Sequence, residues 1–172
     1  MSCKINKFAD MLKRFLLILV LAVSLGGSVG VYAQKFTVKV VGISDGDTFT
    51  GLNRDKLQLK FRINGIDAPE KGQDFGNKAK QTLSDYIFNK EITVDVQSQD
   101  GWGRYIAFVY TPDGRDVSLL MLQAGMAWHF KKYDATEAYA RAEEQARARK
   151  AGLWSMPAPE APWDYRASRR NP

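Results

Sequence analysis

The sequence predicts an α+β fold that is mainly a small β-barrel, with five strands and three helices. Two observations support this prediction. Short segments that alternate apolar and polar residues, rich in β-branched and aromatic side chains, are separated by turn-forming Asp, Gly, Asn and Pro. Segments with helical spacing of apolar residues follow the third and the fifth of these alternating segments.

The first three strands form a predicted meander, because the Asp-Gly-Asp turn at 45–47 joins the first two. Two further strands lie on either side of the Asp-Gly-Trp-Gly turn at 100–103. The expected strands are 36–41, 48–50, 57–62, 92–96 and 105–110.

The first predicted helix, 76–89, places Ala79, Leu83 and Ile87 on one face. A short helix at 117–124 closes at Gly125, and a longer one at 135–151 ends at Gly152. This order of elements is consistent with a barrel of the oligonucleotide-binding (OB) type. The segment after it, 157–172, is a proline-rich tail that we expect to lie extended over the domain, with disorder in its last few residues.

The N-terminal segment has the pattern of a secretory signal peptide. Four cations lead into an apolar core at 15–25, and glycines and the small residue Ala33 follow. An uncleaved membrane anchor is the alternative, but a bilayer span needs roughly 20 apolar residues. We therefore expect an exported protein, periplasmic or extracellular, without a membrane anchor after cleavage. The expected organisation is a signal peptide (1–33), one OB-type barrel domain (34–156) and the tail (157–172).

Removal of residues 1–33, which hold four cations and one acid, lowers the formal net charge from +6 to +3. The only cysteine, Cys3, leaves with them, so the mature chain has no disulfide and no thiol nucleophile. His129 is the single histidine, which excludes a two-histidine nuclease and the histidine or cysteine zinc sites. We expect it to be packed in the fold. No serine lies in a Gly-x-Ser-x-Gly elbow.

Two acidic turns lie at the ends of neighbouring predicted strands. Asp45 and Asp47 occupy the first, and Asp67 and Glu70 the second. Each alone is ordinary turn chemistry. If both turns share one rim of the sheet, their carboxylates converge, and such convergence needs a cation or a shifted proton to offset it. Oxygen-only ligands indicate calcium or magnesium, and outside the cell calcium is the more natural ion.

Two arginines flank this acidic group in sequence. Arg62 ends the third predicted strand, and Arg104 follows the turn at 100–103. A guanidinium can engage two phosphate oxygens and neutralise developing charge, although a surface salt bridge is the simpler role. The combination suits phosphodiester hydrolysis, with Glu70 taking a proton from water, or orienting the water, for in-line attack on phosphorus.

The strings Asp45-Gly-Asp-Thr48, Arg62-Ile-Asn-Gly-Ile-Asp67-Ala-Pro-Glu70 and Gly103-Arg104 resemble the staphylococcal nuclease (thermonuclease) family in order and spacing. The resemblance spans roughly 35–166 and implies a five-stranded OB-fold barrel with three helices. It also implies one calcium ion and hydrolysis of DNA and RNA at the 5′ P–O bond, which leaves 3′-phosphates.

By matching position, the resemblance assigns roles to individual residues. Calcium would be held by Asp47, Asp67 and the backbone carbonyl of Ala68, with Asp45 behind them. Glu70 would be the general base, and Arg62 and Arg104 would contact the scissile phosphate.

The sequence departs from the family pattern in places. Ala68 stands where threonine is familiar, and Gly101 replaces a lysine. Trp102 replaces a tyrosine and can still stack on a base, and Tyr133 is a further candidate for binding the nucleotide.

Two other functions remain open at this point. One is a non-catalytic binding module on the same barrel, which would be expected to lose one of these site residues. The other is a protein that binds a different anionic polymer, which has no need of the acids. We expect a monomer with DNA and RNA as substrates and no stable protein partner.

Overall fold

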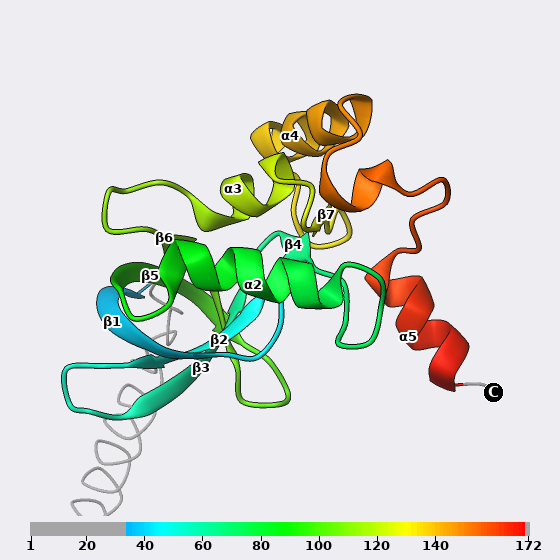
Figure 1. Cartoon of the computed structure of the whole chain (residues 1–172). Helices are drawn as coiled ribbons and strands as arrows, with labels where there is room; N and C mark the ends of the chain where they lie inside the picture. Colours follow the sequence, from blue (N-terminus) through cyan, green and yellow to red (C-terminus); the bar gives the residue numbers. More distant parts are fainter. Residues whose placement is uncertain (1–33, 171–172) are drawn as a thin grey trace, which may run out of the picture. The chain divides into compact units, whose positions relative to one another are not determined.

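The computed structural model describes residues 34–170, and the predicted signal segment lies outside them (Figure 1). Its centre is a closed barrel in the order β1-β2-β3-β6-β5. Neighbouring strands are antiparallel except β3 and β6, which run parallel. The strands are β1 (Gln34–Ile43), β2 (Thr48–Leu52), β3 (Gln58–Ile63), β5 (Glu91–Gln99) and β6 (Tyr105–Tyr110). The five predicted strands and the barrel are therefore confirmed.

The barrel interior is filled by the inward residues of these alternating strands. Phe49 and Phe61 stack inside it, with ring centroids 5.2 Å apart, and both are fully buried. Register shifts interrupt β1 between Val40 and Gly42 and β5 between Val96 and Ser98. Bulges of this kind bend a strand and increase its twist, which is what closure of a five-stranded sheet requires.

The helices predicted from periodicity are present as α2 (Gly76–Ile87), α3 (Val117–Gln123) and α4 (Glu137–Ala148). A short 3-10 helix, η1 (Gly152–Ser155), follows α4. Figure 1 shows α2 lying across the barrel, and its face of Ala79, Leu83 and Ile87 joins the core. None of the helices in residues 34–170 is long and apolar enough to cross a bilayer.

The expectation of an extended C-terminal tail is wrong for 162–170, which form a further helix, α5 (Pro162–Arg170) (Figure 1). Proline is favourable in the first turn of a helix, so Pro162 begins this one instead of preventing it. The preceding residues 156–161 have no regular structure, as the prolines predict.

A two-residue pair, β4 (Ile66–Asp67) with β7 (Trp128–His129), was not predicted. It joins the segment after β3 to the segment after α3 by main-chain pairing, with Asp67 opposite Trp128. The pair fixes the backbone on which Asp67 and Ala68 lie.

The acidic turn between β1 and β2 is held against the second acidic segment by a close approach. A Cβ atom at Gly46 would lie 2.6 Å from the Cβ of Ala68 and 2.7 Å from that of Ala79. Only glycine fits this position without a shift of α2 or of the segment after β4. The two acidic segments therefore share one rim of the barrel.

Candidate active site

The predicted convergence of acids is centred on Arg62. Its Nη1 lies 2.6 Å from Oδ2 of Asp47, and its Nη2 lies 2.9 Å from Oδ1 of Asp67. The side chains of Asp47 and Asp67 are only 6% and 1% exposed. Two buried carboxylates side by side are costly without compensating positive charge, and one guanidinium fork supplies it to both.

The Asp47 carboxylate is also held by its surroundings. The Ala68 N–H donates to Oδ2 at 3.0 Å, and the Thr48 hydroxyl donates to Oδ1 at 2.9 Å. Burial opposes ionisation, but the charge of Arg62 and the Ala68 N–H outweigh it and keep the pKa of Asp47 below its usual value. Asp47 is therefore an ionised, oriented oxygen donor.

The pKa of Asp45 is shifted in the opposite direction from that of Asp47. Its Oδ1 accepts from the Asp47 N–H at 3.0 Å, which closes the turn. Burial first, and then the negative charge of Asp47, raise the pKa of Asp45 to about 6. Asp45 thus supports the turn and adds to the negative field behind Asp47.

Arg166 of α5 is a further member of this cluster that sequence reasoning missed. Its Nη2 lies 2.7 Å from Oδ2 of Asp67 and its Nη1 lies 2.6 Å from Oε1 of Glu70. The Nη1 also donates to Oδ1 of Asp67 at 3.2 Å. Arg166 therefore joins one predicted metal ligand to the predicted general base.

The cluster lies at a cavity of about 1070 Å³. Asp67 is buried and connects to this cavity through Arg62 and Arg166. The cavity wall holds the other predicted site residues, namely Asp45, Asp47, Arg62, Ala68, Glu70, Trp102, Arg104 and Tyr133. It also holds cations and an aromatic ring that were not predicted: Lys60, Lys132, Trp163, Arg166 and Arg170. The wall therefore combines these cations with the acids Asp45, Asp47 and Glu70 and with Asp100 on the turn before β6.

Arg104 lies on this wall but does not contact the predicted acids in the way Arg62 does. Its Nε pairs with Oδ2 of Asp100 at 2.7 Å. Asp100 also accepts the Arg104 and Trp102 N–H groups, and these bonds shape the tight turn between β5 and β6. The Arg104 guanidinium lies 5.3 Å from the Trp102 ring, which is 80% exposed. This turn presents a cation and an open aromatic face together.

The oxygen donors fit a hard divalent cation better than any other metal. Asp47 and Asp67 provide buried carboxylates on adjoining segments, and the backbone carbonyl of Ala68, the next residue after Asp67, is a further oxygen donor. Within residues 34–170 no group of three or more His, Cys, Asp or Glu side chains has the arrangement of a metal site. The guanidinium groups of Arg62 and Arg166 are the positive partners of these carboxylates instead.

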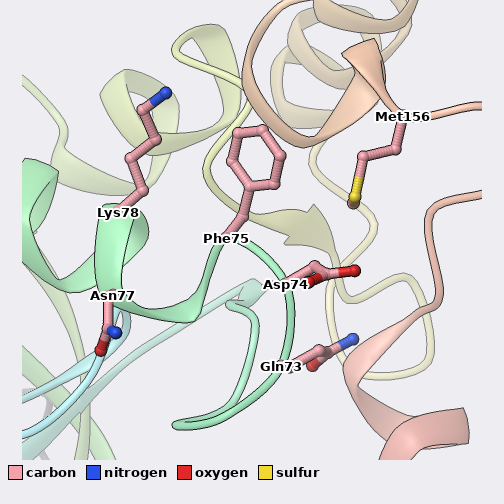
Figure 2. Close-up of a pocket in the computed structure, with 6 residues that line it drawn as sticks. All are labelled: Gln73, Asp74, Phe75, Asn77, Lys78 and Met156. Atoms are coloured by element: carbon pink, nitrogen blue, oxygen red, sulfur yellow. The ribbon is translucent and has the colours of Figure 1, made fainter.

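Two other features are outside this site. His129 is buried, and its Nε2 lies 3.0 Å from Oδ1 of Asp134, so it is a packed residue as expected. A second hollow, of about 620 Å³, is shown in Figure 2. Phe75 and Met156 form its apolar part, and none of the predicted site residues lines it.

Comparison with known proteins identifies the family. The family model described as staphylococcal nuclease homologue matches residues 60–156, more than half of the chain. The chain belongs to the staphylococcal nuclease family. The matched region begins in β3 and ends after η1, so it includes Arg62, Asp67, Glu70 and Arg104.

Individual relatives agree with this family. An uncharacterized endonuclease of Haemophilus influenzae is 41% identical over 133 residues, which are 77% of this chain and 74% of that protein. A micrococcal nuclease of Shigella flexneri is 38% identical, over 79% of this chain and 83% of its own length. An uncharacterized endonuclease of Escherichia coli is 36% identical, over 74% and 83%. As a member of the staphylococcal nuclease family, the protein is a hydrolase that acts on nucleic acid.

Asp45 predicts an unusual pH dependence of stability. Its carboxyl has a pKa of about 6 in the folded protein and about 3.8 in the unfolded chain, so folding takes up a proton between these values. The free energy of unfolding therefore falls as the pH rises through this window. We expect Asp45→Asn to remove this loss, and to be more stable than the wild type by at most about 3 kcal/mol at pH 8. Urea titrations in chelator at several pH values measure the free energy of unfolding of both proteins. The same change of this free energy with pH in the wild type and in Asp45→Asn would contradict the prediction.

Proposed function

We propose that this protein is an exported, calcium-dependent nuclease that hydrolyses phosphodiester bonds of both DNA and RNA. The observation that carries the proposal is the pair of buried carboxylates, Asp47 and Asp67, joined by Arg62 at the edge of a large cationic cavity. Such a site suits a polyanionic substrate in which one phosphodiester bond is hydrolysed next to the carboxylates. The names of the relatives, micrococcal nuclease among them, support the reaction class.

In the proposed hydrolysis, Glu70 and the two arginines have different roles. Glu70, whose side chain is 35% exposed at the cavity, would accept a proton from the attacking water as the oxygen bonds to phosphorus. The 5′ oxygen leaves with its electron pair and takes a proton from solvent, so the products are a 3′-phosphate and a 5′-hydroxyl. Arg62 and Arg104 would neutralise the charge that develops on the phosphate oxygens.

Asp47, Asp67 and the Ala68 carbonyl would hold the calcium ion, which supplies Lewis acidity toward a phosphate oxygen when bound. Export is proposed from the basic, apolar and small-residue order of residues 1–33. Calcium is abundant outside the cell, so the two parts of the proposal are mutually consistent.

The test is incubation of the purified chain from residue 34 with plasmid DNA and with RNA, in calcium and in excess chelator. We expect cleavage of both polymers in calcium and none in chelator. Phosphatase treatment followed by end extension should show that the new 3′ ends carry phosphate. Undiminished cleavage in chelator contradicts the metal mechanism, and free 3′-hydroxyl ends contradict the bond assignment. A fusion of residues 1–33 to a reporter that folds only outside the cytoplasm tests export separately.

A further inference from the structure

Helix α5 presents one continuous stripe of side chains to the cavity. Trp163, Arg166, Ala167 and Arg170 all line it, and their spacing is that of one helical face. Residues 162–170 lie beyond the region that the family model matches, which ends at 156. The stripe therefore lies outside the matched region, as the strands β1 and β2 also do.

The start of α5 is firmly attached to the domain. The Trp163 ring stacks on Phe130 at 5.4 Å with planes 6° apart, and it meets Trp128 edge-on at 5.5 Å. Ala161 is 5% exposed, and the carbonyl of Glu160 accepts from the Gln73 side chain at 2.8 Å. These contacts fix the direction of the helix, so its stripe faces the cavity before any ligand arrives.

Arg166 already holds anionic oxygens in the geometry that a phosphate requires. Its fork engages Asp67 and Glu70, while its side chain keeps 34% exposure at the cavity. A phosphodiester offers the same chemistry, two oxygens that share a negative charge. Arg170 lies one turn further along the same face and extends the positive charge away from the acids.

The aromatic residues of the cavity indicate which form of nucleic acid fits. Trp102 and Tyr133 are 80% and 67% exposed, although large aromatic rings are usually covered. Exposed rings interleaved with cations are the features by which proteins bind single strands, since unpaired bases stack and phosphates pair. A duplex keeps its bases stacked inside and offers these rings nothing comparable.

We infer that α5 is a second wall of the substrate site, on which Arg166 and Arg170 bind consecutive phosphates of a single-stranded nucleic acid. The inference rests on the proposed nuclease function and extends its substrate site to α5. In the free protein Arg166 pairs with Asp67 and Glu70. In the complex its guanidinium turns to the phosphodiester and Arg170 holds the neighbouring phosphate.

The test is fluorescence anisotropy of a labelled single-stranded oligonucleotide with the chain from residue 34, in excess chelator, across a range of salt. Strand length is checked on a gel after each titration. Arg170→Ala and Arg166→Ala are compared with Arg169→Ala. Arg169 has the same charge on the same helix, but its guanidinium stacks on the Tyr165 ring at 3.7 Å, away from the stripe.

We expect Arg170→Ala and Arg166→Ala each to weaken binding about tenfold and to lower the slope of log K against log salt by about 0.7. Arg169→Ala should change binding by less than about twofold. A duplex of the same sequence should bind more weakly and respond less to either change. Arg170→Ala makes the test independent of folding defects, because Arg170 does not hold the buried acids.

Three results overturn the inference. One is an unchanged salt slope in Arg170→Ala. Another is tighter binding in Arg166→Ala, which would mean that Arg166 occupies the site in the free protein and that the substrate must displace it. The third is an equal loss of affinity in Arg169→Ala, which would show that only the net charge of the protein affects binding. Cleavage of DNA by the wild type is measured in parallel. If the wild type cleaves DNA and Arg170→Ala binds the oligonucleotide as tightly as the wild type, only the role of α5 is rejected. A wild type that neither binds nor cleaves rejects the proposed function itself.

Discussion

Replacement of Glu70 with glutamine should lower the rate of phosphodiester cleavage by a factor of about 10²–10⁴, the usual contribution of a positioned general base. Glutamine keeps the shape of the side chain and its hydrogen bond from Arg166, but it has no basic oxygen to accept the proton of water. The side chain is 35% exposed, so the fold should tolerate the change. Single-turnover cleavage of a labelled oligonucleotide in saturating calcium measures the chemical step.

Glu137→Gln is the matched control for this change. Glu137 is 85% exposed on α4 and pairs only with Arg141 on the surface, so the cleavage rate should be unaltered. A rate for Glu70→Gln within about tenfold of the wild type would remove Glu70 from the role of base. A binding defect with an unchanged single-turnover rate would reassign it to holding Arg166.

Arg62→Ala should combine a loss of stability with a loss of activity. Arg62 is the shared counter-ion of Asp47 and Asp67, and its removal leaves Asp47 without its ion-pair partner and Asp67 with Arg166 alone. In chelator we expect the free energy of unfolding to fall by about 3–5 kcal/mol, the usual cost of breaking a buried ion pair. Cleavage in calcium should fall by a factor of about 10²–10³, as when one donor to a developing oxyanion is lost.

Calcium separates the two effects of Arg62→Ala. A cation held by Asp47 and Asp67 would replace part of the missing charge, so calcium should restore stability more than it restores cleavage. Arg115→Ala is the control, because Arg115 pairs with Asp113 on the surface with both side chains 59% exposed. Its unfolding free energy should change by less than about 1 kcal/mol. Stability of Arg62→Ala equal to that of the wild type in chelator would contradict this account.

The barrel was predictable because each strand can be recognised from its own alternation of apolar and polar residues. Alternating residues such as those of β3 can bury one face only as a strand, and Asp-Gly and Asp-Gly-Trp-Gly turns mark where the chain reverses. The meeting of Asp47 and Asp67 was predictable for a related reason, since Asp47 precedes β2 and Asp67 follows the antiparallel neighbour β3, which places both at one rim. Arg62 as their common partner follows from the same register, because Arg62 pairs with Thr48 across β2 and β3.

The contribution of α5 was not predictable in the same way. Prolines in 157–162 suggested extended chain, and only the spacing of Trp163, Arg166 and Arg170 shows the helical face. Even with the helix known, nothing local shows that Arg166 meets Asp67, which lies 99 residues earlier. The pairing of β4 with β7 had no signal either, because two residues are too few to show a period. The assigned roles of Glu70, Arg104, Trp102 and Tyr133 stay predictions.

The parallel pairing of β3 with β6 has a consequence for how this protein acquires activity. Hairpins can form from neighbouring residues, but β3 and β6 meet only after α2 and β5 have been threaded between them. Pairings between distant segments form late because loop-closure entropy opposes them. Asp47 and Arg62 belong to the early hairpin, whereas Arg104 precedes β6 and Arg166 comes last in the chain. Under the proposed roles of Arg104 and Arg166, a partly folded or partly synthesised chain lacks a complete site, and we expect it to leave nucleic acid around it uncut until folding is finished.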